Sequence, residues 1–188
     1  MPNYRRALIP SGTYFFTVVT CDRCPIFNNP RSVAILGNVI REAKSRWPFS
    51  IDAIVLLKDH WHSIWTLPRN DDQYSRRMAW IKREFTVRWL EKGGVGMGIS
   101  ASKQQQRRKG VWQPRFWEHC INDDDEFDAY FDYIHWNPVK HSVVDRVKDW
   151  PYSSFHRWVR QSVYSSDWGC GGIGLKTVKS QESMGEPW

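Results

Sequence analysis

The chain has 188 residues, 41% of them hydrophobic, which is enough material for one domain with a substantial core. It has no apolar run near the roughly 20 residues of a membrane-spanning helix and no apolar signal core at its start, so we expect a cytoplasmic protein. Its net charge is +7, with eleven Lys and Arg against three Glu in residues 74–118, which is typical of a nucleic-acid partner, a solvated basic helix and loop being the alternative.

The first third of the chain alternates strand and helix patterns. A β-branched and aromatic run at 13–20 predicts a buried strand, and apolar residues near helical spacing predict a helix over 31–47. Two further strands are predicted at 49–57 and 60–67, and Lys58 and Asp59 form the short turn between them. These two strands therefore read as a hairpin or a tightly connected pair.

The middle of the chain is more basic. Residues 74–92 carry an apolar stripe with cations largely elsewhere, which predicts an amphipathic helix. A segment rich in Gly, Ser and Gln at 93–110 predicts a flexible loop, and a strand is expected near the end of 111–121. A helix then runs from 124 to about 136, because the next residue precedes a proline.

This order of elements predicts an α+β fold with helices on one side of an antiparallel sheet. A ferredoxin-like split βαβ unit fits best, and it is also the architecture of RNA-recognition modules. We expect one domain over residues 1–158 and a partly flexible tail over 159–188.

Two histidines, His60 and His62, stand on either side of Trp61. Side chains at i and i+2 of a strand leave the same face, so both imidazoles would point to one place and Trp61 toward the core side. A metal ion can be held in this way, although two unrelated histidines can also fall at this spacing by accident.

The predicted helix over 124–136 offers two more candidates. Tyr133 lies at the flank of its core stripe, and Asn137 follows one turn later. Two imidazoles and an amide suit Mg²⁺ or Mn²⁺ when a substrate phosphate completes the shell, and a nearby tyrosine is a plausible nucleophile. The core stripe itself consists of Phe127, Tyr130, Phe131 and Ile134.

Several longer motifs resemble one known family. HWH at 60–62 is similar to the HUH motif, and the blocks WQPRFWEH at 112–119 and DYIHWNPVKH at 132–141 resemble the REP-associated tyrosine transposases. The opening YRR at 4–6 and the strand that follows it are similar as well. The resemblance covers roughly residues 3–158, in family order.

The resemblance implies an HUH nuclease fold and a metal-dependent enzyme that cleaves and rejoins single-stranded DNA. Tyr133 matches the family nucleophile, His60 and His62 match the metal-binding histidines, and Asn137 matches the third ligand of Mg²⁺ or Mn²⁺. The implied reaction leaves a 5′-phosphotyrosine and a free 3′-OH at a REP-type hairpin, within the bacterial nucleoid. Nothing in the sequence demands a partner chain, so we expect a monomer.

The phenol of Tyr133 has an ordinary pKa of about 10, so it needs a nearby positive charge or a base in order to attack. The candidates near it in the sequence are Lys140, His141 and His135. His135 points about 200° away from Tyr133 on the helix. Arg5 and Arg6 could enter a groove as an arm or belong to a solvated terminus. Residues 115–117 could read bases, with core packing and a salt bridge as alternatives. The full set of candidate DNA contacts is Arg5, Arg6, Arg76, Arg77, Lys82, Arg83, Arg115, Phe116, Trp117 and Lys140.

Two other functions compete with this interpretation. A non-catalytic single-strand binder could use the same fold, although it would not need the histidines and the amide together. A zinc protein could use Cys21 and Cys24, but a lone CxxC without a second pair is a weak metal signal. A metal titration would separate the three.

Overall fold

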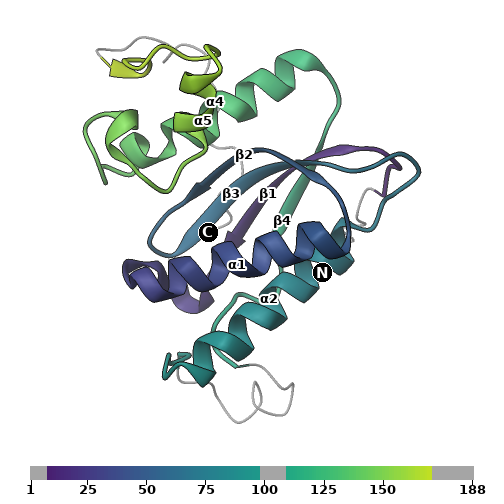
Figure 1. The fold of residues 1–188 in the computed structure, drawn as a ribbon, viewed down its shortest axis with the longest axis vertical. Helices are drawn as coiled ribbons and strands as arrows, with labels where there is room; N and C mark the ends of the chain where they lie inside the picture. Colours follow the sequence, from purple (N-terminus) through teal and green to yellow (C-terminus); the bar gives the residue numbers. More distant parts are fainter. Residues whose placement is uncertain (1–7, 98–108, 171–188) are drawn as a thin grey trace.

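The structure is a computed structural model that describes residues 8–97 and 109–170. Its centre is an antiparallel sheet in the order β2-β3-β1-β4 (Figure 1). The strands are β1 (Thr13–Val19), β2 (Ser50–Leu56), β3 (His60–Thr66) and β4 (Trp117–Ile121). Since β1 and β2 both pair antiparallel with the strand between them, the predicted split βαβ unit is confirmed.

Helices cover both faces of this sheet, so the expectation of helices on one side was wrong (Figure 1). On one face pack α1 (Pro30–Arg46) and α2 (Tyr74–Glu91), and on the other pack α4 (Asp124–Lys140) and α5 (Phe155–Arg160). Three short 3-10 helices, Cys21–Arg23, Ile26–Asn28 and Val147–Asp149, lie in the connections.

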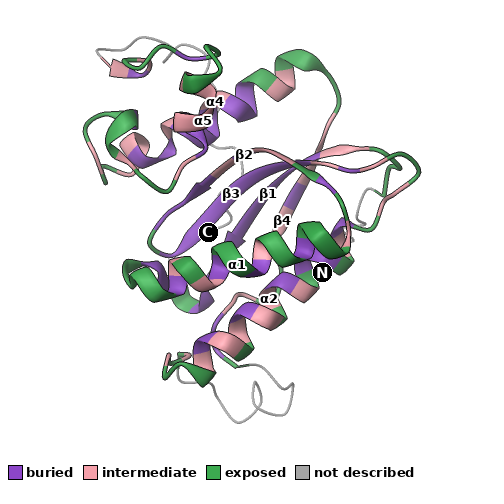
Figure 2. Ribbon diagram, in the orientation of Figure 1, coloured by how far each residue is buried: buried purple, intermediate pink, exposed green. Residues whose placement is uncertain are grey.

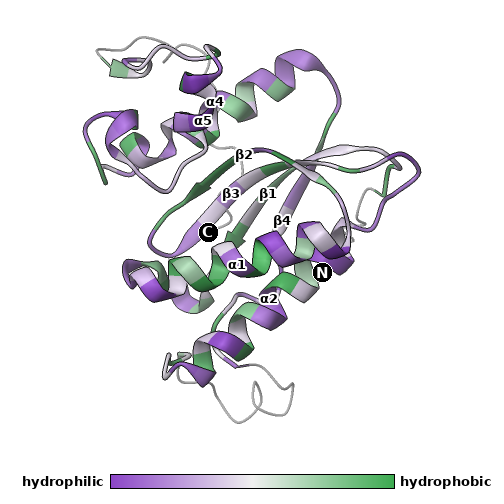
Figure 3. Cartoon of the chain, viewed as in Figure 1, coloured by the Kyte–Doolittle hydropathy of each residue, from purple (hydrophilic) through white to green (hydrophobic). Residues whose placement is uncertain are grey.

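The strands themselves explain why both faces are covered. In β1, Tyr14 and Phe16 point into the core under α1 and α2, whereas Phe15 points into the core under α4. Residues of both orientations are buried along the strand, as Figure 2 shows, and Figure 3 shows hydrophobic residues along much of β2. A sheet that is apolar on both faces has to be covered twice.

The end of α4 also differs from its prediction. The helix does not stop at Trp136 but continues to Lys140 with Pro138 inside it. A proline removes one backbone donor, but the His141 amide still donates to the Asn137 carbonyl at 3.0 Å, so the last turn persists. As a result Asn137 and Lys140 belong to the same rigid helix as Tyr133.

The segment after α4 packs back onto the sheet and onto α4. The Trp150 indole donates to the Leu56 carbonyl at 2.9 Å, and the Trp158 indole donates to the Asp52 carbonyl at 2.8 Å. Tyr164 packs against Phe131 with ring centroids 5.6 Å apart. The chain therefore contacts the core under α4 beyond residue 158. Arg5, Arg6 and much of the predicted loop and tail lie outside the described residues. None of the described helices is long and apolar enough to cross a membrane.

Candidate active site

Strand β3 places both histidines on the face that α4 covers. His60 is paired with Val19 of β1 and His62 with Thr17, while Trp61 packs into the opposite core. The two imidazoles are 2% and 0% exposed, and their ring centroids lie 4.9 Å apart. The prediction that both rings leave the same face of the strand is therefore confirmed.

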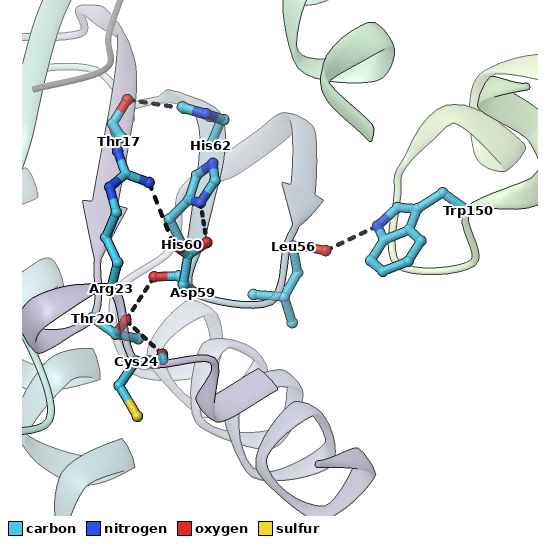
Figure 4. Close-up of polar contacts among 9 residues, drawn as sticks. All are labelled: Thr17, Thr20, Arg23, Cys24, Leu56, Asp59, His60, His62 and Trp150. Carbon is cyan, nitrogen blue, oxygen red and sulfur yellow. Dashed lines mark hydrogen bonds and ion pairs between the residues drawn. The ribbon is translucent and has the colours of Figure 1, made fainter. Parts of the chain in front are cut away.

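Each imidazole is held through its Nδ1 atom (Figure 4). Thr17 Oγ1 lies 2.9 Å from Nδ1 of His62, and Asp59 Oδ1 lies 2.7 Å from Nδ1 of His60. A hydrogen bond at one ring nitrogen fixes the orientation of the ring and leaves Nε2 as the nitrogen that can bind a metal. Nε2 of His60 has no hydrogen-bond partner within residues 8–97 and 109–170.

Asp59 is itself anchored from two directions. The Thr20 hydroxyl donates to its backbone carbonyl at 2.9 Å, and the Arg23 guanidinium lies 3.4 Å from Oδ2 (Figure 4). Burial on its own would raise the pKa of the Asp59 carboxyl, but the hydrogen bond and charge of His60, together with Arg23, hold that pKa below its usual value. Asp59 is therefore a charged anchor for His60 at neutral pH.

Helix α4 brings the tyrosine and the amide to the same place. Tyr133 is fully buried rather than at a flank, because its ring lies 5.4 Å from that of His62 and 6.0 Å from that of Phe15. The Lys140 ammonium donates to the Tyr133 hydroxyl at 3.2 Å and lies 4.9 Å from the ring centroid. Of the three groups proposed to assist this tyrosine, the structure places Lys140 in direct contact with it.

The other two groups have different surroundings. His135 is buried on another side of α4, with Nε2 2.8 Å from Ser154 Oγ and Nδ1 3.3 Å from Tyr164 Oη. Burial, helped by the charge of Arg157, lowers its pKa to about 3, although a bond with the Phe131 backbone acts the other way. The predicted orientation away from Tyr133 is confirmed. The His141 ring lies 5.2 Å from that of His60.

The candidate donor set, two imidazole nitrogens and one amide oxygen, consists of groups that bind divalent cations. Asn137 is fully buried, and neither its amide oxygen nor its amide nitrogen has a hydrogen-bond partner in the described part of the chain. A buried polar atom without a partner is costly, and a bound metal ion is one group that can satisfy an amide oxygen or an imidazole nitrogen. Three His, Cys, Asp or Glu side chains do not cluster as metal ligands anywhere in residues 8–97 and 109–170. Cys21 and Cys24 are among these residues, so they do not belong to such a cluster, as the zinc alternative would require.

One candidate DNA contact is contradicted. The Arg77 side chain is 3% exposed, its guanidinium lies 2.6 Å from Asp71 Oδ2, and it also donates to the Pro48 carbonyl at 3.2 Å. A guanidinium that is buried and bonded in this way is not placed to meet a phosphate. The helical pattern could not show this, because the partners of Arg77 lie in the segments that precede β2 and α2.

The other candidates remain predictions, and the structure distinguishes their surroundings. Arg115 is exposed, Phe116 packs against Phe16 in the core under α1 and α2, and Trp117 packs against Phe15 on the face that carries the histidines. On α2, Lys82 donates to the Gln113 carbonyl at 2.8 Å, Arg83 pairs with Glu84, and Arg76 lies over the Trp47 ring.

Comparison with known proteins identifies the family. The sequence profile of a family described as "Transposase IS200 like" matches residues 9–137. A Haemophilus influenzae protein assigned to the REP-associated tyrosine transposases is 43% identical over 169 residues, covering 90% of this chain and 94% of that protein. The REP-associated tyrosine transposase of Escherichia coli is 40% identical over 168 residues, covering 89% and 91%. This chain belongs to the REP-associated tyrosine transposase family.

A solved structure of a REP-associated tyrosine transposase bound to a REP hairpin has the same fold. It superposes with a TM-score of 0.77 at 37% identity and covers 100% of this chain and 99% of its own. The expected family and fold class are thus both confirmed for this transposase.

Three residues that orient the histidines of this transposase were missed by the sequence analysis. Asp59 directly precedes the HWH motif, so its position was a signal that could have been used. Thr17 meets His62 only because β1 and β3 pair in one particular register, and Arg23 reaches Asp59 from a turn after β1. Neither contact has a local signature.

Proposed function

We propose that this transposase cleaves and rejoins single-stranded DNA at REP-type hairpins, with Tyr133 as nucleophile and Mg²⁺ or Mn²⁺ held by His60, His62 and Asn137. The observation that carries the proposal is the meeting of β3 and α4, where the Tyr133 ring lies 5.4 Å from that of His62. The hairpin as substrate is supported by the relative that was solved with a REP hairpin.

The proposed reaction exchanges one bond at phosphorus for another. The Tyr133 oxygen bonds to the scissile phosphorus while the bond from phosphorus to the 3′-oxygen breaks, and the net result moves the hydroxyl proton from Tyr133 to that 3′-oxygen. The products are a 5′-phosphotyrosine and a 3′-OH. Attack of that 3′-OH on the phosphotyrosine restores the diester, so the cycle needs no energy-rich cofactor.

The side chains around Tyr133 have distinct tasks. The Lys140 ammonium, which donates to Oη, stabilises negative charge that develops on this oxygen. Thr17 and Asp59 fix the two rings so that their Nε2 atoms are directed to a metal. When bound, the metal supplies a positive charge that polarises the scissile phosphate. Burial of Tyr133 and Asn137 excludes water, which strengthens these electrostatic effects.

We also propose that the transposase acts as a monomer at the bacterial nucleoid. The histidines and the tyrosine of one site belong to one chain, and the relatives that match are bacterial proteins. The alternative is a non-catalytic hairpin binder with the same fold. Against it stand Nε2 of His60 and the Asn137 amide, which a binder would leave buried without a bond among the described residues.

The test replaces Tyr133 by Phe, which removes one hydroxyl and little surface. We expect Tyr133→Phe to reduce cleavage of a labelled REP-type hairpin oligonucleotide by at least about 10³-fold, on the scale of other lost catalytic groups. Hairpin affinity in a gel-shift titration should change less than about threefold. The wild type should also retain DNA covalently on a denaturing protein gel when Mn²⁺ is present.

Tyr130→Phe is a matched control on the same helix. Tyr130 is buried in the core beneath α4, its ring 4.4 Å from that of Phe15. Its substitution should leave cleavage near the wild-type rate. Tight hairpin binding without cleavage by the wild type, with either metal, would instead identify the chain as a binder.

A further inference from the structure

A pocket of about 340 Å³ opens directly beside His60 and extends to Lys58 and His141, which have no role in the proposed reaction. Such a volume can take a phosphate with part of its nucleotide. Its Lys, Arg and Asp groups are two cations, Arg23 and Lys58, and one carboxylate, Asp59, which together carry a net charge of +1. The lining residues are Arg23, Leu57, Lys58, Asp59, His60, His141 and Val143.

Arg23 reaches this pocket from an unusual turn. Both Asp22 and Arg23 have left-handed backbones, with φ of 51° and 50°, although neither is a glycine. Such conformations persist only where the surroundings hold them, and they gather at functional sites. Here the Arg23 amide donates to the Thr20 carbonyl at 3.2 Å and the Cys24 amide to the Cys21 carbonyl at 3.0 Å. The turn therefore directs the Arg23 guanidinium toward Asp59 and His60 (Figure 4).

The bond that Arg23 makes there leaves room for a second acceptor. Its guanidinium lies 3.4 Å from Asp59 Oδ2, near the long limit for a hydrogen bond, and its side chain is 38% exposed. A guanidinium has five donors, so it can keep Asp59 and bind a phosphate oxygen together.

Lys58 and His141 come to the same pocket from two other elements. Lys58 is exposed at the turn between β2 and β3, and its carbonyl accepts from the Phe27 amide at 2.9 Å, which fixes the turn. His141 follows the last residue of α4 and is half-buried beside His60. The pocket thus brings two cations, Arg23 and Lys58, together with a third possible donor, His141.

We infer that this pocket binds a second backbone phosphate of the DNA strand, adjoining the scissile one, through Arg23, Lys58 and His141. The inference rests on the proposed function, because the scissile phosphate is assigned to the metal site at His60 and His62. A phosphate bound in this pocket sets the direction of the DNA strand. The DNA leaves the metal site past His60 and the turn between β2 and β3.

The first experiment does not depend on hairpin binding or cleavage. Inorganic phosphate is titrated into the wild-type protein at constant ionic strength, with chloride as the control anion, and NMR signals of the Arg23 and Lys58 amides and the His141 ring are followed. We expect saturable shifts at these groups in the wild type. Lys58→Ala should weaken them about fivefold, as for a partly exposed ion pair. Lys44→Ala, which removes an exposed lysine of α1 on the opposite face, should leave them unchanged.

The second experiment locates the phosphate on the DNA. In a Tyr133→Phe background, affinity is measured for hairpin oligonucleotides that carry one uncharged methylphosphonate at each position in turn. At one position next to the cleavage site, the methylphosphonate should weaken hairpin affinity about fivefold in the Tyr133→Phe protein. The same methylphosphonate should not weaken affinity further when Lys58→Ala is added. All other positions should respond equally in the two proteins.

The outcomes separate the pocket from the proposed function. NMR shifts on addition of phosphate, together with one methylphosphonate position whose effect depends on Lys58, support the inference. Phosphate shifts in a protein that binds no hairpin would keep the anion pocket and remove the proposed substrate. Cleavage of the hairpin without any coupled position, or an absence of phosphate shifts in the folded protein, would overturn the inference and leave the proposed function standing.

Discussion

Lys140 contacts the hydroxyl of the proposed nucleophile Tyr133 directly. The ammonium donates to Oη at 3.2 Å, so it stabilises charge on the attacking oxygen. We expect Lys140→Met to lower the single-turnover cleavage rate about 10²-fold, the scale of losing one preorganised donor. Lys140→Arg should recover part of the rate. The rate is measured at saturating protein, so that a change in hairpin affinity does not enter.

Lys140 was also expected to contact DNA, and the same variants separate the two roles. If Lys140→Met weakens hairpin affinity but leaves the saturated cleavage rate intact, its role is to bind a phosphate rather than to assist Tyr133.

Two neighbouring arginines of α2 have opposite environments. Arg77 is buried and bonded to Asp71, whereas Arg76 is exposed with its guanidinium 5.1 Å from the Trp47 ring centroid. Arg77→Ala should reduce the free energy of unfolding by about 2–3 kcal/mol, because it leaves a partly buried carboxylate and two carbonyls without their donor. Arg76→Ala should cost less than about 0.5 kcal/mol. Urea titration checks both values, and equal losses would contradict the structural role of Arg77.

At the scale of whole elements, α4 is tied to the segment that follows it through one buried histidine. His135 bonds to Ser154 and contacts Tyr164, and burial lowers its pKa to about 3 from an ordinary 6.5. Between these values the unfolded chain binds a proton that the folded chain does not. The contribution of His135 to stability should therefore be constant above about pH 6.5 and fall as the pH drops toward 3, by an amount on the order of 3–5 kcal/mol.

His135→Gln tests this dependence, because glutamine keeps a polar group beside Ser154 but does not titrate. We expect the variant to be less stable at pH 7 and to show a smaller loss of stability between pH 6.5 and 4 than the wild type, measured by thermal unfolding. Asp132 opposes the effect in both proteins, since burial raises its pKa and acid then favours the folded state. Equal slopes in the two proteins would show that His135 is not the group responsible.

At the scale of the whole molecule, the histidines and the tyrosine of the proposed site lie in one chain. His62 on β3 and Tyr133 on α4 meet inside the same fold, with ring centroids 5.4 Å apart. A mixture of Tyr133→Phe and His60→Ala proteins should therefore stay inactive, because neither chain can lend its intact group to the other. Recovery of about a quarter or more of the wild-type cleavage would instead show a site shared between two chains.

The sequence by itself determined the elements and the two groups that β3 presents. Strand and helix patterns are local, so five of the predicted elements agree with the structure to within about two residues at each end. His60 and His62 share a face because a strand repeats every two residues. The family motifs pointed to Tyr133 and Asn137 on one helix, and the structure places both there.

Only the tertiary structure decided which groups meet. Whether helices cover one face of the sheet or both depends on how the strands pair and stack. The burial of the Arg77 side chain depends on backbone carbonyls about thirty residues away, which accept its hydrogen bonds. Thr17 reaches His62 through strand register, and Lys140 reaches Tyr133 because α4 continues through Pro138. Periodicity gives the direction in which a side chain leaves its own element, but its partner comes from long-range packing, which no local pattern contains.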